Sequence, residues 1–129
     1  MQSIKEQLQD NLIKQGFSGD IVSDKKTREA YATDESIFYI EPELVLKAKS
    51  AEDVMLATQE VTELHTNERP LHITPRAAGT GLSGGSLNDS IILDTTTYMN
   101  NIHEVHKDGD DLLIRLQPCL LYTSDAADD

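Results

Sequence analysis

The chain has 129 residues and a formal net charge of −12, from 11 Lys and Arg against 23 Asp and Glu. So acidic a chain lacks the basic surface that attracts nucleic acids or anionic lipids. No apolar run approaches the roughly 20 residues of a membrane-spanning helix, and the start does not resemble a signal peptide. We therefore expect a soluble one-domain protein with no transmembrane segment and no nucleic-acid partner, either cytoplasmic or peripheral at the inner face of the membrane.

The first 30 residues are predicted to form a helix followed by a linker. Ile4, Leu8 and Leu12 recur every four residues, which indicates an amphipathic helix over residues 1–16. Gly16 is placed to end this helix. Residues 18–30 are rich in charged side chains, and we expect them to be a solvated connection.

The next segment predicts a β-α-β unit. Residues 44–48 favour a strand, and Ser50 is followed by acidic residues, as at a helix N-cap. Apolar residues at helical spacing then predict a helix of about 14 residues, near the common length. Residues 71–74 form the second strand, so the two strands are expected to be parallel with a right-handed crossover.

The stretch that follows, residues 75–86, carries the strongest functional signal. It reads Pro-Arg-Ala-Ala-Gly-Thr-Gly-Leu-Ser-Gly-Gly-Ser and holds four of the seven glycines of the chain. Glycine leaves peptide N–H groups uncovered, and a run of such groups forms a concave nest for an anion, typically a phosphate. The loop leaves from the carboxyl end of a strand, where open α/β sheets place their ligands. We expect it to cradle the diphosphate of a nucleotide cofactor.

Two familiar phosphate motifs do not explain this loop. Residues 79–84 match G-x-G-x-x-G, but the dinucleotide-binding fingerprint requires a helix after the glycines. Only residues 85–89 separate the loop from the apolar run 91–93, which is too short for a crossover helix. No Lys-Ser or Lys-Thr follows the last glycines, so the P-loop is excluded as well.

Three strand candidates follow without intervening helices, at residues 90–94, 101–106 and 112–117. The Asp-Gly pair within residues 107–111 favours a hairpin between the last two. The expected fold class is α+β, with a small β-α-β unit followed by an antiparallel β meander.

Several segments together resemble the FAD-linked oxidases, whose flavin domain is of the vanillyl-alcohol oxidase or PCMH type. The glycine loop resembles the Pro-Arg and Gly-Thr-Ser/Gly-Leu-Ala/Ser-Gly loop that wraps the FAD diphosphate in that family. The resemblance runs in the family's order through Tyr-Ala-Thr-Asp-Glu-Ser (31–36), Pro42 with the strand 44–48, Ile-Leu-Asp (92–94) with Tyr-Met-Asn (98–100), and Leu-Gln-Pro (116–118). It is closest in character to the flavin subunits of D-lactate dehydrogenase and glycolate oxidase.

This resemblance implies an FAD site made by the loop itself. The cofactor-binding residues would be Pro75, Arg76, Ala77, Ala78, Gly79, Thr80, Gly81, Leu82, Ser83, Gly84 and Gly85. Arg76 would lie beside the diphosphate or support the loop, whereas the simpler interpretation is a surface arginine at a strand end. Thr80 stands where many relatives carry the histidine that bonds the flavin, so the FAD is expected to be non-covalent.

The resemblance further implies an FAD-dependent 2-hydroxy-acid dehydrogenase or oxidase, of the D-lactate or glycolate type, that passes a hydride to the flavin. An electron acceptor would reoxidise the flavin, and the catalytic base, the substrate site and any iron–sulfur cluster would lie downstream in the family's layout. No catalytic residue is assigned here, and this fragment alone is expected to be inactive. The alternative is a stand-alone nucleotide- or anion-binding module, which DNA sequence beyond the codon for Pro118 would distinguish.

The chain is expected to divide into an N-terminal helix and linker (1–30), a partial FAD-binding domain (31–118) and a tail (119–129). The tail resembles the translation of a sequencing-library adapter and is expected to be non-native, the alternative being a divergent natural C-terminus. His103 and His106 lie on a predicted strand, where positions three apart point to opposite faces, so no metal site is expected. Asp34 and Ser36 would build a turn through side-chain bonds to their own backbone. The resemblance implies instead that Tyr31 and Asp34 pack near the cofactor, and it assigns neither a catalytic role.

Overall fold

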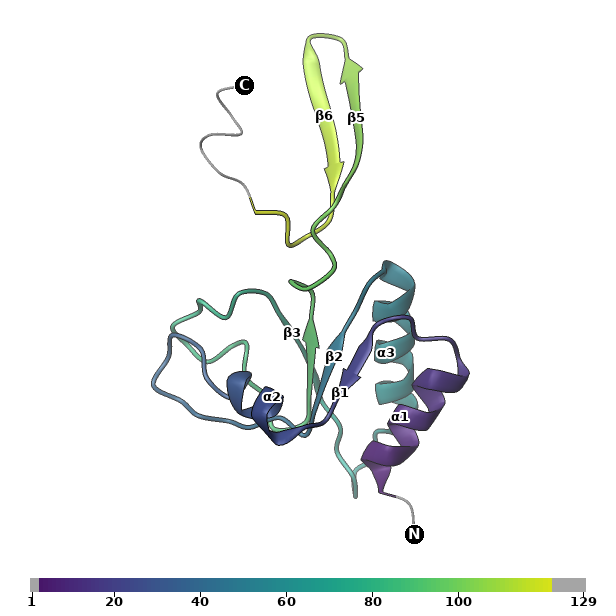
Figure 1. The fold of residues 1–129 in the computed structure, drawn as a ribbon, viewed down its shortest axis with the longest axis vertical. Helices are drawn as coiled ribbons and strands as arrows, with labels where there is room; N and C mark the ends of the chain where they lie inside the picture. Colours follow the sequence, from purple (N-terminus) through teal and green to yellow (C-terminus); the bar gives the residue numbers. More distant parts are fainter. Residues whose placement is uncertain (1–2, 122–129) are drawn as a thin grey trace.

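The computed structural model describes residues 3–121 and shows a mixed α+β fold with a separate hairpin (Figure 1). The elements in chain order are α1 (Ile4–Lys14), β1 (Asp20–Val22), α2 (Lys25–Ala30), β2 (Leu44–Lys47), α3 (Ala51–Leu64), β3 (Ile73–Arg76), β4 (Ile91–Asp94), β5 (Ile102–Asp108) and β6 (Asp111–Leu116). The predicted fold class is confirmed.

Helix α3 begins at the predicted serine cap, whereas α1 begins at Ile4 within the predicted range 1–16. Ser3 caps α1 in a reciprocal capping box with Glu6, and the Ser50 side chain accepts a hydrogen bond from the Asp53 N–H at the start of α3. After α1 the chain turns at Gly16, whose φ of 88° lies in the left-handed region that favours glycine. Local patterns therefore suffice to fix these two helices.

The central sheet has the strand order β1-β2-β4-β3. β4 pairs with β2 and with β3, parallel to both, while β1 pairs antiparallel to β2. The prediction that β2 and β3 are parallel is confirmed, but they are not neighbours. The prediction that residues 90–94 open an antiparallel meander is wrong, because β4 lies between β2 and β3 and is parallel to both. Every residue of β4 is buried, as a strand covered on both faces requires.

The expected solvated connection over residues 18–30 holds a short strand and a short helix, although none of its residues is buried. Ile21 and Val22 lie in β1, at the edge of the sheet, opposite Leu46 and Val45 of β2. Asp24 caps α2 by accepting a hydrogen bond from the Thr27 N–H. Because β1 and α2 are short and lie among charged residues, neither shows a recognisable apolar periodicity in the sequence.

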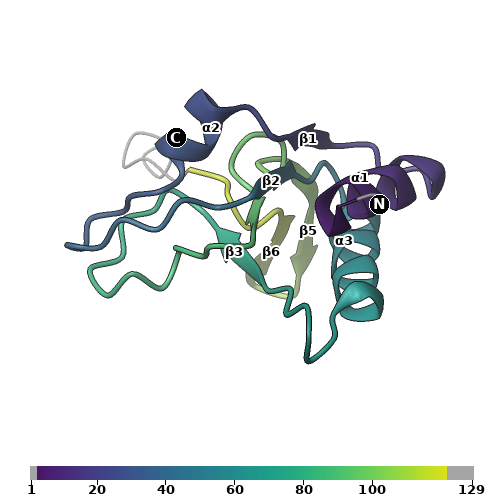
Figure 2. The same cartoon turned by 90° about the horizontal axis from the view of Figure 1, so that it is seen from below.

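The helices α1 and α3 lie side by side on one side of the sheet, as Figures 1 and 2 both show. Leu8 and Leu12 of α1 are almost fully buried in the core, against α3 and the strands. The buried Glu60 of α3 accepts hydrogen bonds from the side chains of Asn11 and Gln15. Residues of α1 and β1 therefore share one core with the sheet, and the assignment of residues 1–30 as a separate unit stays a prediction.

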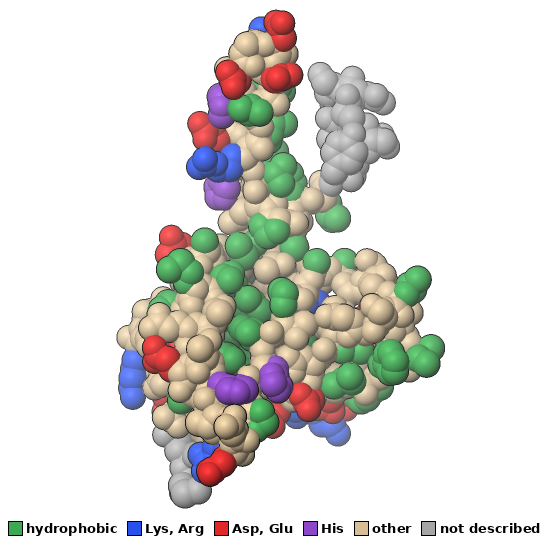
Figure 3. Space-filling model, turned by 180° about the vertical axis from the view of Figure 1, so that it is seen from behind, with side chains coloured by type: hydrophobic (Ala, Val, Ile, Leu, Met, Phe, Trp, Pro, Cys, Tyr) green, Lys and Arg blue, Asp and Glu red, His purple; other side chains and the backbone are tan. Residues whose placement is uncertain are grey.

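The hairpin of β5 and β6 stands away from this body (Figure 1) and turns at Gly109, as the Asp-Gly pair predicts. One of its faces carries the apolar pairs Ile102–Leu116 and Val105–Ile114, and all four side chains are about half exposed. Figure 3 shows apolar side chains along the projecting hairpin. Within residues 3–121, β5 and β6 pair only with each other, so both strands have an open edge.

Of the expected non-native tail, residues 119–129, the structure describes only Cys119–Leu121. The remaining eight positions lie outside the described residues. The Cys119 N–H donates a hydrogen bond to the Met99 carbonyl, and its Sγ lies 2.9 Å from the hydroxyl oxygen of Thr95. The assignment of the tail stays a prediction.

Candidate functional site

The glycine-rich segment connects two neighbouring parallel strands. It leaves β3 at Arg76 and reaches β4 at Ile91, and the structure shows no helix between them. Parallel strands are usually joined by a crossover helix. Here the loop itself is the crossover: it leaves from the carboxyl end of β3, where open α/β sheets bind ligands, and returns to the amino end of β4.

The backbone of this loop offers unused hydrogen-bond donors. Among the described residues, no N–H group of residues 78–86 donates to another protein atom. Most of these residues are exposed, so their donors remain open to a ligand. Consecutive uncovered N–H groups attract an anion, because each N–H carries a partial positive charge. The segment that the sequence singles out is therefore rich in N–H donors without a protein acceptor among the described residues.

Two glycines are required by the shape of the loop. Gly79 and Gly84 have φ values of 71° and 75°, a conformation that other residues adopt at a cost. At Gly79 a Cβ atom would lie 2.5 Å from Nη2 of Arg76, and at Gly84 it would lie 2.9 Å from the Phe38 ring. Gly81 has neither constraint, since its φ is not positive and its Cβ position has no neighbour within 4 Å. Gly81 is thus free for a function other than shaping the loop.

A second segment, residues 33–40, lies against the glycine loop. The Glu35 N–H donates to the Gly79 carbonyl at 3.2 Å, and the Ser86 hydroxyl donates to a carboxylate oxygen of Asp34 at 3.0 Å. The other Asp34 oxygen accepts from the Ser36 N–H at 2.8 Å, which confirms the predicted turn. Hydrogen bonding by the Ser36 side chain is the main cause that lowers the pKa of Asp34, and the Ser36 N–H lowers it further. Asp34 is thus an ionised acceptor that fastens the two segments together.

Arg76 supports the loop from within the protein. Its side chain is 9% exposed, and its guanidinium donates to the carbonyls of Tyr31 and Thr33 at 3.2 and 2.8 Å. Among the described residues it forms no ion pair with a carboxylate. The simpler interpretation, a surface arginine, is therefore wrong. Of the two functional alternatives, the contacts match a support of the loop, and contact with a diphosphate stays a prediction.

The sequence did not reveal the contact between Tyr31 and Asp94. The Tyr31 hydroxyl donates to Oδ2 of Asp94 at 2.6 Å, and the backbone and side chain of Thr97 and the hydroxyl of Thr96 also donate to this carboxylate. Burial alone would raise the pKa of Asp94, but these hydrogen bonds outweigh it and lower the pKa. Burial and the bond to Asp94 raise the pKa of Tyr31. Asp94 is thus a buried carboxylate that remains ionised. Only its place in the Ile-Leu-Asp resemblance could have pointed to it.

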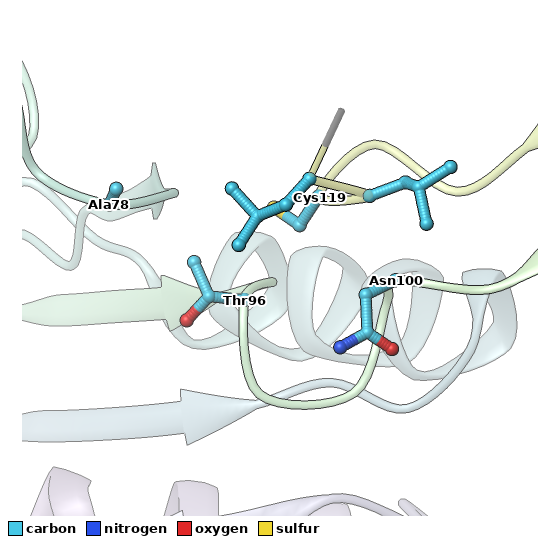
Figure 4. Close-up of a pocket in the computed structure, with 6 residues that line it drawn as sticks. Ala78, Thr96, Asn100 and Cys119 are labelled. Carbon is cyan, nitrogen blue, oxygen red and sulfur yellow. The ribbon is translucent and has the colours of Figure 1, made fainter. Parts of the chain in front are cut away.

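A cavity of about 470 Å³ lies at the same end of the sheet. Figure 4 shows Ala78 from the loop, Thr96 from beyond β4, and Asn100 and Cys119 around it. Half of its lining, Cys119–Leu121, belongs to the expected non-native tail. The cavity therefore lies beside the glycine loop, but the expected tail determines about half of its shape.

Metal ligands are not gathered anywhere in residues 3–121: no group of three His, Cys, Asp or Glu side chains is placed to hold an ion. His103 and His106 lie exposed on β5, as expected. The helices in this part of the chain are also too short or too polar to cross a membrane.

A family model described as "FAD binding domain" matches residues 42–120, more than half of the chain. The chain belongs to this family of FAD-linked oxidases. The match includes every residue of the glycine loop and extends two residues into the expected tail. The family resemblance and the cofactor, FAD, are thereby confirmed.

Curated relatives carry the same name in several bacteria. D-2-hydroxyglutarate dehydrogenase of Pantoea ananatis (strain AJ13355) is 38% identical over 97 residues, which are 75% of this chain. The protein of that name from Escherichia coli (strain K12) is also 38% identical, over 74% of this chain. The chain spans only 9% of the length of each of these relatives.

Two solved structures share the fold. 6-Hydroxy-D-nicotine oxidase from Arthrobacter nicotinovorans superimposes with a TM-score of 0.56 and 27% identity, covering 68% of this chain and 19% of that one. A BBE-like 1 variant from Physcomitrella patens gives a TM-score of 0.57 at 13% identity, over 74% of this chain and 20% of that one. The second likeness concerns the fold alone.

Proposed function

We propose that residues 75–85 hold the diphosphate of a non-covalently bound FAD. The observation that carries this proposal is the run of N–H groups in residues 78–86 without a protein acceptor. Phosphate oxygens would accept these donors, and the positive charge of the buried Arg76 beneath the loop would favour an anion. Thr80 supports non-covalent binding, because its hydroxyl does not form the histidine-type bond to the flavin.

FAD would supply the hydride-accepting ring, while this chain would hold the phosphate end of the cofactor. The whole protein would oxidise a 2-hydroxy acid. The name shared by the relatives favours D-2-hydroxyglutarate over the D-lactate or glycolate expected from the sequence. An electron acceptor and an iron–sulfur cluster would belong to parts of the protein other than residues 3–121. A cytoplasmic location, at most peripheral to the membrane, is part of this proposal.

Titration of the ¹⁵N-labelled chain tests the loop. We expect FAD and ADP to shift the amide resonances of residues 78–86, because both carry a diphosphate. Adenosine, the matched control, should leave these resonances in place. Shifts that spare the loop, or an equal response to adenosine, would contradict the proposed binding site.

The substrate is tested on the full-length flavoprotein that contains this sequence. Under anaerobic conditions, D-2-hydroxyglutarate should bleach the visible absorption of the bound flavin, because hydride transfer reduces it. D-lactate and glycolate serve as comparisons. Bleaching by either of them but not by D-2-hydroxyglutarate would refute the proposed substrate, and no bleaching by any of the three would refute 2-hydroxy-acid oxidation.

A further inference from the structure

The guanidinium of Arg76 joins the glycine loop to residues 31–33. It is held by the Tyr31 and Thr33 carbonyls, and its Cζ lies 5.3 Å from the centre of the Tyr31 ring. It also lies directly beneath Gly79, since a Cβ atom at Gly79 would overlap Nη2. The place of this guanidinium therefore limits how closely the turn at Gly79 approaches the body.

Tyr31 is itself held by Asp94. The hydroxyl of Tyr31 donates to the carboxylate at 2.6 Å, and Asp94 is only 2% exposed. Asp94 is also the register partner of Arg76 in the β3–β4 ladder. The three residues thus close a ring: backbone pairing joins Arg76 to Asp94, a side-chain bond joins Asp94 to Tyr31, and a side-chain-to-carbonyl bond joins Tyr31 back to Arg76.

We infer that Asp94 and Tyr31 are positioning residues that set the glycine loop for the cofactor through Arg76. Neither residue needs to touch the FAD. The ionised carboxylate fixes the Tyr31 ring, the ring and its carbonyl fix the guanidinium, and the guanidinium fixes the turn at Gly79. This inference rests on the proposed FAD site only for its consequence for affinity, since the position of the loop is measurable without FAD.

The test uses Tyr31→Phe, which keeps the ring over the guanidinium and removes only the bond to Asp94. In the absence of FAD, we expect the Gly79 and Thr80 amide resonances to move while thermal unfolding stays cooperative. We expect FAD affinity to fall roughly tenfold, the order of effect for one hydrogen bond to a charged group. Asp94→Asn should do the same, and the double variant should be no weaker than either single one.

Tyr98→Phe is the matched control. Its hydroxyl donates to Asp20 at 2.8 Å, so this variant removes a similar tyrosine–aspartate bond away from the loop. We expect no change in the Gly79 amide or in FAD affinity. An unmoved Gly79 amide in Tyr31→Phe, additive effects in the double variant, or an equal loss in Tyr98→Phe would overturn the inference. Absence of FAD binding by the unaltered chain would instead refute the proposed function, and the Gly79 resonance would still decide the positioning role.

Discussion

Replacement of Gly79 by valine is expected to abolish FAD binding. At φ 71° a side chain with a Cβ atom is strained by about 1–2 kcal/mol, and its Cβ would overlap the Arg76 guanidinium. The turn must then shift, and the N–H groups no longer converge on the diphosphate. Gly84→Val should act similarly, through its φ of 75° and its contact with the Phe38 ring. The measurement is FAD titration of each variant, followed by amide shifts or by fluorescence.

Variants at two other glycines distinguish a changed loop shape from a direct clash with the ligand. Gly109 also has a positive φ, but it lies at the hairpin turn, so Gly109→Val should leave FAD binding intact. Gly81→Ala should leave the loop unchanged, because its Cβ meets no protein atom. Any loss of FAD affinity in Gly81→Ala would therefore report crowding of the ligand itself. A Gly79→Val protein that folds and binds FAD normally would refute the assignment of the loop.

The double variant Val105→Thr/Ile114→Thr is expected to raise the solubility of the 129-residue chain severalfold. These two residues are register partners on the apolar face of the hairpin and are 54% and 50% exposed. Uncovered strands with an apolar face promote pairing between chains, and threonine keeps the β propensity without the apolar surface. The measurement is light scattering against protein concentration. The variant would also be the better background for FAD titration.

The control for this double variant is Leu113→Thr, on the opposite face beside His106. It removes one apolar side chain of the hairpin but leaves the apolar face intact, so we expect little gain in solubility. The unaltered chain should be poorly soluble at high concentration, and colourless when purified alone. If it stays monomeric at the concentrations used for NMR, the apolar face of the hairpin does not drive association.

Local signals in the sequence account for much of the fold. Helical spacing and serine caps define α1 and α3, and the Asp-Gly pair defines the turn at Gly109. The position of β4 was missed because the partners of a strand are not encoded in its own residues. An all-apolar run such as Ile91–Leu93 indicates burial on both faces, and this signal argued against the expected meander.

In the candidate site, too, local features could be predicted from the sequence, whereas long-range contacts could not. The clustering of glycines identifies the loop, and the resemblance identifies its ligand. The direction of the Arg76 side chain could not be predicted, because its acceptors, the carbonyls of Tyr31 and Thr33, lie more than 40 positions away in the sequence. The Tyr31–Asp94 bond spans 63 positions, so no pattern of spacing could reveal it. Contacts of this kind follow from strand order, which the sequence does not state.

The place of β4 between β2 and β3 has a consequence for how the chain folds. β2 and β3 are made first, yet neither can pair with the other, since each pairs with β4. During synthesis the sheet therefore cannot be completed until residues 91–94 have emerged from the ribosome and paired between β2 and β3. Such non-local pairing is slow, because loop closure costs entropy before any contact repays it. Since the glycine loop closes only when β4 docks on β3, a nucleotide that binds the closed loop would hold the completed sheet together and slow its unfolding.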